Sequence, residues 1–304
     1  MTRVPSRGRY AARQVDPMRN RGSQAPVTAA ESGKSQTRPV VLDAVEGDES
    51  REREDLVACE EPLEIQLGPA SLAVVMRTPG HDEELALGFA VTERIVASAA
   101  DVVSIRHCTT ALSPESEDNV IRVVLAPHVE VDLAALRRNL YASSSCGICG
   151  KATIENVLAT APPLEDDRST FTADVIRNFP SSLGDRQAVF RSTGGLHAAG
   201  LFDASGKRLV VREDVGRHNA VDKVIGWAAT RGLLPLSGHA LMVSGRVSYE
   251  IVQKALAARI PLVAAVSAPS SLAIELAAAS AMGLVGFLRG DAMNVYAGRW
   301  RVKP

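Results

Sequence analysis

The second half of the chain alternates short, wholly apolar segments with segments of helical periodicity. The apolar segments are residues 240–243, 261–266 and 284–288. A strand that is apolar along its whole length is covered on both faces, so this alternation predicts a parallel or mixed β-sheet with helices on each side. In such folds ligands bind in loops beyond the carboxyl ends of the strands. We therefore expect the loops 244–246, 267–271 and 289–291 to share one rim.

The first half predicts an N-terminal group of strands around one helix. Strands are expected at residues 63–67, 72–76, 102–107 and 120–125. Asp82 is the expected N-cap of a helix whose buried side carries Leu85, Phe89 and Val96. A further helix is expected over residues 132–140, leading into a cysteine loop.

The N-terminal region differs in composition from the rest of the chain. Residues 1–40 are rich in Arg, Ser, Gly and Pro and have almost no apolar periodicity, so we predict a disordered extension. The acidic segment 46–55 is expected to be a solvated lead-in, with order beginning near Leu56. The predicted organisation is one domain over residues 56–300, with the N-terminal strands packed on it.

Residues 143–151, Ser-Ser-Ser-Cys-Gly-Ile-Cys-Gly-Lys, carry two thiols between small, flexible residues. A helical pattern, with Ile154 and Val157 on one face, begins directly after Cys146 and Cys149. A cysteine beside a helix N-terminus faces unpaired backbone N–H groups and the positive end of the helix dipole, which favour thiolate over thiol. Lys151 adds a positive charge. The segment therefore predicts two reactive, accessible thiols.

Three other roles for the thiol pair remain as alternatives. A structural zinc site needs four ligands, and the remaining cysteines of the chain, Cys59 and Cys108, are single and far apart in sequence. A structural disulfide suits a secreted protein, but the start of the chain lacks an apolar secretory signal. Two buried, inert thiols fit poorly with the Ser- and Gly-rich setting. The absence of a secretory signal also predicts a cytosolic location, where thiols stay reduced.

Composition excludes two broad functional classes. The chain has 304 residues, is 46% hydrophobic and 23% charged, and carries a formal net charge of −1. This balance is typical of a globular protein and argues against a general binder of nucleic acid or of membrane surfaces. Residues 260–288 are apolar apart from Glu275, but Pro261 and Pro269 interrupt them, so they do not predict a membrane span.

Two loops of the expected rim suit a phosphorylated ligand. Ser244-Gly245-Arg246 before a helix offers a hydroxyl, backbone N–H groups and a guanidinium, although Ser-Gly at this place is also a common helix cap. Residues 289–291 read as a hairpin turn between two strands. His197 and His218 are expected in glycine-rich loops. They are candidates for proton donors or ligand contacts, but hydrogen-bonded structural histidines are the preferred interpretation of both.

Four segments of the chain closely resemble the formate dehydrogenase accessory sulfurtransferases. These segments are residues 76–89, 143–150, 212–223 and 244–250, and the resemblance runs from about residue 56 to 298. It implies a cytidine-deaminase-like α/β fold, a mixed sheet sandwiched between helices, and a homodimer.

The resemblance also implies a function. Members of this family are thought to accept sulfur from a cysteine desulfurase as a persulfide on the C-x-x-C pair. They pass it to the metal of a molybdenum or tungsten bis(molybdopterin guanine dinucleotide) cofactor, which then enters formate dehydrogenase. Cys146 matches the persulfide-bearing residue and Cys149 its neighbour. The guanine-dinucleotide segment falls on Phe287, Leu288, Arg289, Gly290, Asp291 and Ala292.

Other functions compete with this interpretation. A zinc deaminase carries His-x-Glu and Pro-Cys-x-x-Cys, and this chain has His81-Asp82-Glu83 and Cys146-x-x-Cys149. However, the two elements are too far apart, and Ser145 replaces the proline. A non-covalent chaperone of the pterin cofactor does not need two nucleophilic thiols. A thioredoxin-like reductase lacks its βαβ context here.

Overall fold

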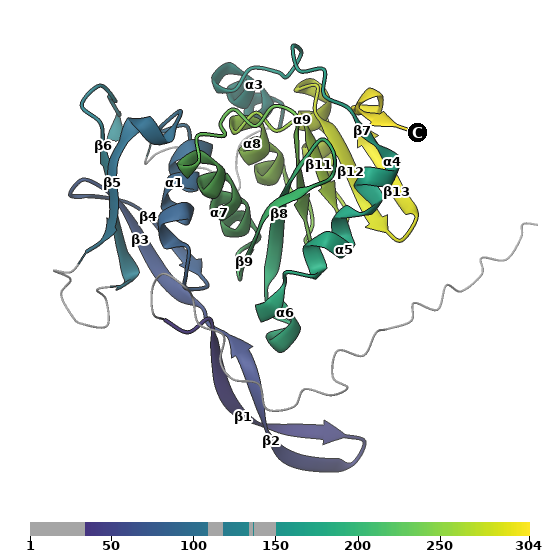
Figure 1. Ribbon diagram of the computed structural model, residues 1–304. Helices are drawn as coiled ribbons and strands as arrows, with labels where there is room; N and C mark the ends of the chain where they lie inside the picture. The colour runs from purple at the N-terminus through teal and green to yellow at the C-terminus, as the bar shows by residue number, and fades with distance from the viewer. Residues whose placement is uncertain (1–33, 109–117, 134–135, 137–149) are drawn as a thin grey trace, which may run out of the picture.

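The centre of the molecule is a six-stranded mixed sheet. The computed structural model describes residues 34–108, 118–133, 136 and 150–304. The strand order is β13-β12-β11-β10-β8-β9, in which β10, β11 and β12 are parallel and the other neighbours antiparallel (Figure 1). The strands are β8 (His197–Asp203), β9 (Arg208–Asp214), β10 (His239–Val243), β11 (Leu262–Ala265), β12 (Gly283–Arg289) and β13 (Ala292–Ala297). The predicted mixed sheet is confirmed.

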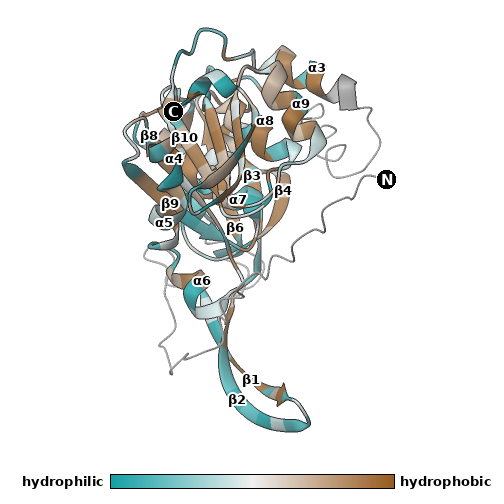
Figure 2. Ribbon diagram, turned by 90° about the vertical axis from the view of Figure 1, so that its right-hand side faces the viewer, coloured by the Kyte–Doolittle hydropathy of each residue, from teal (hydrophilic) through white to brown (hydrophobic). Residues whose placement is uncertain are grey.

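Helices cover both faces of this sheet, as the apolar strands predicted. One face packs against α7 (Arg217–Thr230), α8 (Tyr249–Ala257) and α9 (Ser271–Ala279). The other packs against α4 (Ala173–Arg177), α5 (Phe179–Gly184) and the short pair β7 (Phe171–Thr172) and β14 (Val302–Lys303). Alternate residues of β10 pack against the two layers. Leu241 and Val243 face the first layer, and Ala240 and Met242 face the second. Figure 2 shows these strands as a hydrophobic interior.

A second sheet of four strands packs on helix α1 (Asp82–Thr92). Its order is β4-β3-β6-β5. Its strands are β3 (Glu61–Leu67), β4 (Ala70–Arg77), β5 (Val102–His107) and β6 (Val120–Leu125), with the short helix η1 (Ala99–Asp101) before β5. Leu63, Ile65 and Leu67 alternate into the core with almost no exposure. The predicted strands of the first half are thereby confirmed.

The two sheets are joined by direct contact between the backbones of α1 and α7. A Cβ atom added to Gly88 would lie 1.8 Å from the carbonyl oxygen of Asp222, and one added to Gly226 would lie 1.8 Å from that of Glu84. These distances are far below van der Waals contact. Only glycine at both positions lets the helices approach this closely, and α1 is consequently buried on nearly all sides.

A long hairpin projects from the body and corrects the expected start of order. Strand β1 (Thr37–Glu46) pairs with β2 (Glu49–Ala58) along its whole length (Figures 1 and 2). We expected a solvated lead-in up to residue 55 and order only from Leu56. Residues 37–58 instead form a two-stranded ribbon, and residues 37–40 within it belong to the extension that was expected to be disordered. Helix α6 (Ala188–Thr193) contacts β2.

Some helix ends differ from the predicted ones. The N-cap of α1 is His81, not Asp82, because the carboxylate of Asp82 pairs with Arg77. The same helix ends at Thr92 and therefore does not include Val96.

Helix α7 also begins earlier than the capping pattern suggested. It starts at Arg217, so Asn219 lies inside its first turn instead of capping it. The predicted helix after the cysteine loop is confirmed as α3 (Gly150–Thr160). The predicted helix 132–140 lies largely outside the described residues. The chain ends with η3 (Arg299–Arg301) and β14.

Candidate functional site

Three parallel strands direct their carboxyl ends to one edge of the six-stranded sheet. These are β10, β11 and β12, and the loops that follow them are those predicted to share a rim. The backbone N–H of Phe287 donates to the carbonyl oxygen of Ser267 (3.1 Å), and Arg289 Nε donates to that of Val266 (3.2 Å). These bonds join the loop after β11 to the end of β12, which supports the shared rim.

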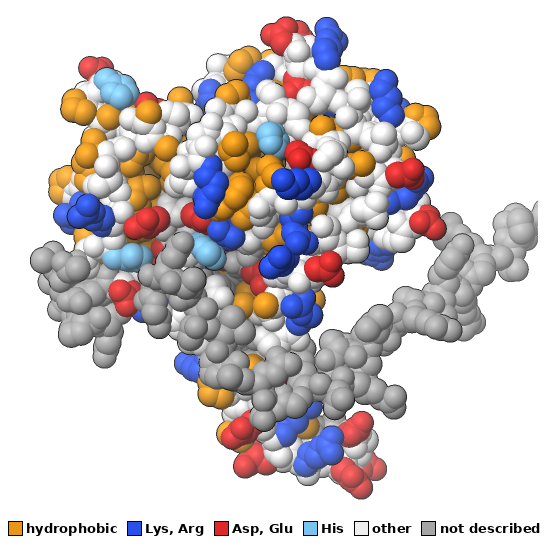
Figure 3. All heavy atoms as spheres, viewed as in Figure 1, with side chains coloured by type: hydrophobic (Ala, Val, Ile, Leu, Met, Phe, Trp, Pro, Cys, Tyr) orange, Lys and Arg blue, Asp and Glu red, His pale blue; other side chains and the backbone are white. Residues whose placement is uncertain are grey.

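Strands β8 and β9 bring two further residues to the same edge. His197 begins β8, opposite Asp214 at the end of β9. Ser244 Oγ accepts a hydrogen bond from the backbone N–H of Ala198 (2.9 Å), so the loop after β10 lies directly beside the start of β8. On the face shown in Figure 3, lysine and arginine side chains gather over β8, β9 and α7.

Two helices begin at this edge without a side-chain cap. The N-caps of α7 and α8 are Gly216 and Ser248, and neither side chain caps its helix, whereas α9 is capped by Ser270. Uncapped helix N-termini present unpaired N–H groups and a positive partial charge. The edge therefore attracts anions.

Two arginines add full positive charge to the edge. Within the described part of the chain, neither Arg217 nor Arg246 forms an ion pair with a carboxylate, and Arg217 Nε is buried without a hydrogen-bond partner. We did not assign Arg217 from the sequence. The available signal was the repeated Gly-Arg at two strand-to-helix turns, Gly216-Arg217 and Gly245-Arg246.

His218 and His197 are neutral components of this edge. Both stand in regular structure, not in the glycine-rich loops inferred from the sequence. His218 Nε2 lies 3.2 Å from Ser248 Oγ and 3.9 Å from Glu250 Oε2. Burial, followed by the charge of Arg217, lowers the pKa of His218 to about 4, and the same two causes lower the pKa of His197. Both rings are therefore uncharged at neutral pH, and His218 is hydrogen-bonded as the structural interpretation expected.

A pH experiment tests the buried state of His218. The pKa of His218 is lower in the folded than in the unfolded protein, so the folded state favours the neutral ring. The free energy of unfolding therefore decreases as the pH falls from about 6.5 toward 4. We expect the unfolding temperature of the wild type to fall more steeply over this range than that of His218→Gln, which keeps an amide for Ser248. Parallel curves for the two proteins would contradict the lowered pKa.

A buried polar network supports the edge from behind. Lys223 Nζ lies 2.6 Å from Asp214 Oδ2, with both side chains fully buried. Lys223 Nζ also donates to the carbonyl oxygen of Thr78 (2.9 Å), and the backbone N–H of Thr78 donates to Asp214 (3.2 Å). Asn219 Nδ2 donates to the Met76 carbonyl oxygen (2.7 Å). The network thus holds the segment 76–89 against the segment 212–223.

His81 stands at the start of α1 in a left-handed backbone conformation, φ 58°. Arg212 binds Glu84 through two hydrogen bonds of 2.6 and 2.8 Å. Burial and then Arg212 lower the pKa of His81 to about 4. The guanidinium of Arg212 beside the ring disfavours protonation of His81.

Of the deaminase-like motif, only His81-Asp82-Glu83 lies within the described residues. Arg77 engages the carboxylate of Asp82 through bonds of 3.1 and 3.0 Å, and Glu83 is exposed. Among the described residues, no group of three His, Cys, Asp or Glu side chains is placed to hold a metal ion.

The segment predicted to bind the guanine dinucleotide forms the tip of the β12–β13 hairpin. Phe287 is 40% exposed in a left-handed conformation, φ 51°, and Arg289 Cζ lies 5.9 Å from its ring. Gly290 makes the turn with φ 54°, and Leu288 is buried. Asp291 and Ala292 are exposed at the tip. A left-handed aromatic residue carries backbone strain, which tends to persist where the side chain is used.

The predicted catalytic residues Cys146 and Cys149 lie outside the described residues. What the structure describes is the helix that follows them, because α3 begins at Gly150. Cys59 and Cys108 are both half-buried, and burial raises the pKa of Cys59. A raised pKa leaves less thiolate, so Cys59 is a weaker nucleophile than a free cysteine.

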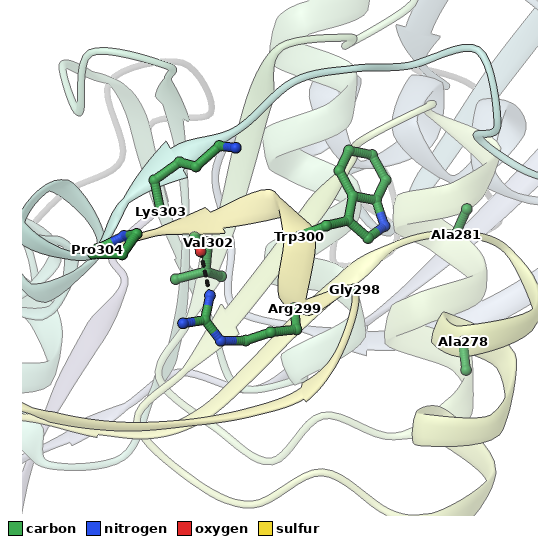
Figure 4. Close-up of a pocket in the computed structure, with 8 residues that line it drawn as sticks. All are labelled: Ala278, Ala281, Gly298, Arg299, Trp300, Val302, Lys303 and Pro304. Carbon is green, nitrogen blue, oxygen red and sulfur yellow. Dashed lines mark hydrogen bonds between the residues drawn. The ribbon is translucent and has the colours of Figure 1, made fainter.

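A large open cavity lies at the opposite edge of the six-stranded sheet. Its volume is about 780 Å³, and it lies between the end of α9 and the C-terminal segment (Figure 4). Its lining consists of Ala278, Ala281, Gly298, Arg299, Trp300, Val302, Lys303 and Pro304. None of the predicted site residues is among them.

None of the described helices is both long and apolar enough to cross a lipid bilayer.

Fold and site together define an α/β protein whose mixed sheet presents a polar, anion-attracting edge. The sequence matches the model of the FdhD/NarQ family over residues 58–303. The chain belongs to this family.

Individual relatives agree with this assignment. A sulfur carrier protein FdhD from Nocardia farcinica is 48% identical over 274 residues, covering 90% of this chain and 96% of the relative. One from Streptomyces coelicolor is 50% identical over 82% of this chain and 90% of its own length. The crystal structure of a putative formate dehydrogenase accessory protein from Desulfotalea psychrophila shares the fold, with a TM-score of 0.68 at 24% identity over 88% of this chain and 99% of that one.

Proposed function

We propose that this protein is a sulfurtransferase for the maturation of formate dehydrogenase. In this proposal it takes sulfur from a cysteine desulfurase as a persulfide and delivers it to the molybdenum bis(molybdopterin guanine dinucleotide) cofactor, which is the substrate. The family assignment supports the proposal, because relatives that match most of the chain are named sulfur carrier proteins. The observation that carries it is that three of the four resembling segments meet at one edge of the sheet.

Cys146 is the proposed sulfur acceptor. Its thiolate attacks the outer sulfur of the donor persulfide, a new S–S bond forms, and the donor cysteine leaves as a thiolate that takes up a proton. The helix α3 supports this chemistry, because its N-terminus directly follows Cys149 in the chain and favours thiolates nearby. The reaction requires reduced thiols, which the cytosol maintains.

The edge is the proposed binding site for the guanine dinucleotide part of the cofactor. The uncapped ends of α7 and α8, together with Arg217 and Arg246, offer N–H donors and positive charge to phosphate oxygens. The exposed ring of Phe287 offers an apolar surface for a planar base. The exposed residues of the segment 287–292 and the loop at Ser244 would hold the ligand.

Guanosine diphosphate is expected to bind this edge as a partial mimic of the cofactor. A ligand that binds only the folded state raises the unfolding temperature by mass action. We expect a rise with GDP in the millimolar range and a much smaller rise with Arg217→Gln, since that variant loses one phosphate-directed charge. The measurement is thermal unfolding monitored by calorimetry or dye fluorescence. No shift with GDP, or equal shifts in both proteins, would remove the support for this pocket.

The decisive experiment for the whole function is mass spectrometry of the intact protein after incubation with a cysteine desulfurase and cysteine. Gain of a sulfur atom that a reductant removes supports a persulfide carrier. Cofactor binding without any sulfur gain supports the alternative, a non-covalent chaperone. A homodimer is also part of the proposal, and sedimentation analysis tests it.

A further inference from the structure

Three helices end in the same way, with a non-glycine residue in a left-handed conformation. Arg94 after α1, Arg259 after α8 and Ala281 after α9 have φ values of 61°, 63° and 56°. In each case the next N–H group bonds back five residues into the helix, from Ile95 to Ala90 (2.8 Å), Ile260 to Ala255 (2.9 Å) and Met282 to Ala277 (2.9 Å). This is the helix ending in which glycine is usual, because a Cβ atom disfavours the left-handed region.

The two arginines direct their side chains at one target, the end of α3. Arg94 Nη2 donates to the carbonyl oxygen of Thr160, and its Nη1 donates to that of Ala257 (3.3 Å). Arg259 Nη1 donates to the carbonyl oxygen of Pro162, and its Nη2 donates to that of Pro163 (3.2 Å). Carbonyl groups at a helix C-terminus lack intrahelical partners and carry negative partial charge, so cationic donors suit them.

Nothing else in the described structure neutralises these two cations. Among the described residues neither Arg94 nor Arg259 is paired with a carboxylate. Burial, followed by the charge of Arg259, lowers the pKa of Arg94. Their partners are the carbonyl oxygens of Thr160, Pro162 and Pro163 and, for Arg94, also that of Ala257. The guanidiniums also line a cavity of about 680 Å³ beside α1 and α8.

The described side chains of α3, those of residues 154–160, have few other attachments to the body. Among residues 154–160, only Val157 is buried, Ile154 and Leu158 are half-buried, and the remaining side chains are exposed. One narrow apolar stripe allows a short helix to tilt or slide. Bonds from two separate helices to its C-terminal end restrict both movements.

We propose that Arg94 and Arg259 are positioning residues that clamp α3 to α1 and α8. Strained backbone conformations are retained where the side chain is used, and here two strained positions serve the same helix end. The proposal rests on the proposed function in one respect: α3 begins at Gly150, which is joined by a peptide bond to Cys149. The clamp therefore fixes the point from which the cysteine segment extends, and it sets the rate of persulfide acceptance without touching the reacting sulfur.

The test uses the double variant Arg94→Gly/Arg259→Gly, with Ala281→Gly as a matched control. Glycine removes the side-chain bonds but suits the left-handed backbone, so the fold should survive and the unfolding temperature should stay close to that of the wild type. Ala281 has the same helix ending and lines the open cavity (Figure 4), and its methyl group cannot form a hydrogen bond to α3. It reports the effect of glycine alone.

Two measurements decide the proposal. Amide hydrogen exchange in residues 154–161 should rise by roughly tenfold or more in the double variant and stay unchanged in Ala281→Gly, with the central sheet protected in both. The rate of persulfide acceptance should fall several-fold in the double variant only. The double Arg→Lys variant, which keeps charge but has no fork of donors, should restore part of both.

Contrary results separate the clamp from the function. Unchanged exchange of α3 in the double glycine variant would show that the arginines do not hold the helix. Raised exchange with an unchanged persulfide rate would show that the clamp does not position the reaction. A wild type that accepts no sulfur at all refutes the proposed function, and exchange then still decides whether the clamp exists.

Discussion

Cys146→Ala is expected to abolish sulfur acceptance and the activation of formate dehydrogenase while the protein remains folded. The attacking group in persulfide transfer is a thiolate, and an alanine in its place offers no nucleophile. The measurement is the sulfur content of the intact protein after incubation with a cysteine desulfurase and cysteine, together with the activity of the client enzyme. We expect Cys149→Ala to do equal or less damage, depending on whether sulfur moves between the two thiols.

Cys59→Ala and Cys108→Ala are the matched controls for this prediction. Both residues are half-buried, and burial, followed by the charge of Glu61, raises the pKa of Cys59, which keeps it as a thiol. Both variants should accept sulfur as the wild type does. A Cys146→Ala protein that gains sulfur at the full rate would overturn the assignment of the acceptor.

Gly226→Ala is expected to cause a large loss of stability. Its new Cβ would lie 1.8 Å from the carbonyl oxygen of Glu84, 2.7 Å from the carbonyl carbon and 2.9 Å from the backbone nitrogen of Gly88. All three are backbone atoms of α1, so no side-chain rotation relieves the clash. The helices must separate, and we expect the free energy of unfolding to fall by about 3 kcal/mol or more.

The separation would also disturb the polar contacts between these helices. Thr92 Oγ1 of α1 donates to Asp222 Oδ1 of α7 (2.8 Å), and Lys254 Nζ lies 2.9 Å from the other oxygen of the same carboxylate. Asp222 and Lys254 are buried, and a buried charge that loses its partners is strongly destabilising. The loss should therefore exceed that from steric strain alone.

Gly184→Ala is the control for this variant. Gly184 ends helix α5, has no positive φ, and has no atom within 4 Å of an added Cβ. Alanine there should change the denaturant midpoint little. The measurement is urea unfolding of the three proteins, and a midpoint for Gly226→Ala close to that of Gly184→Ala would be incompatible with the observed contact between α1 and α7.

Local patterns in the sequence predicted most of the secondary structure. The alternation of Leu63, Ile65 and Leu67 predicted β3, and the wholly apolar segments predicted β10, β11 and β12. These predictions succeeded because strand periodicity and burial on both faces are visible residue by residue. The shared rim followed from the rule that parallel strands end at the same edge.

Other local signals were overridden by hydrogen-bond partners that the local pattern does not specify. Asp82 has the chemistry of an N-cap, but the buried guanidinium of Arg77 takes its carboxylate. Asn219 has the chemistry of a cap too, but its amide bonds to Asp214 and to the Met76 carbonyl oxygen. The acidic segment 46–55 reads as solvated, yet it pairs as part of a hairpin. A buried polar group without a hydrogen bond is strongly destabilising. A charge-assisted or buried hydrogen bond to such a group therefore outweighs the smaller gain from capping a helix.

The sequence by itself determined the mixed α/β class, the pair of thiols before a helix and the edge at which the strand ends meet. These depend on chain-local properties: residue period, turn chemistry and the spacing of two cysteines. Only the tertiary structure decided that α1 and α7 touch through Gly88 and Gly226, that Asp214 and Lys223 join two distant segments, and that Arg94 and Arg259 meet at the end of α3. Each of these contacts depends on how segments far apart in the chain are placed relative to one another. Packing sets that placement, and a local sequence pattern contains no information about it.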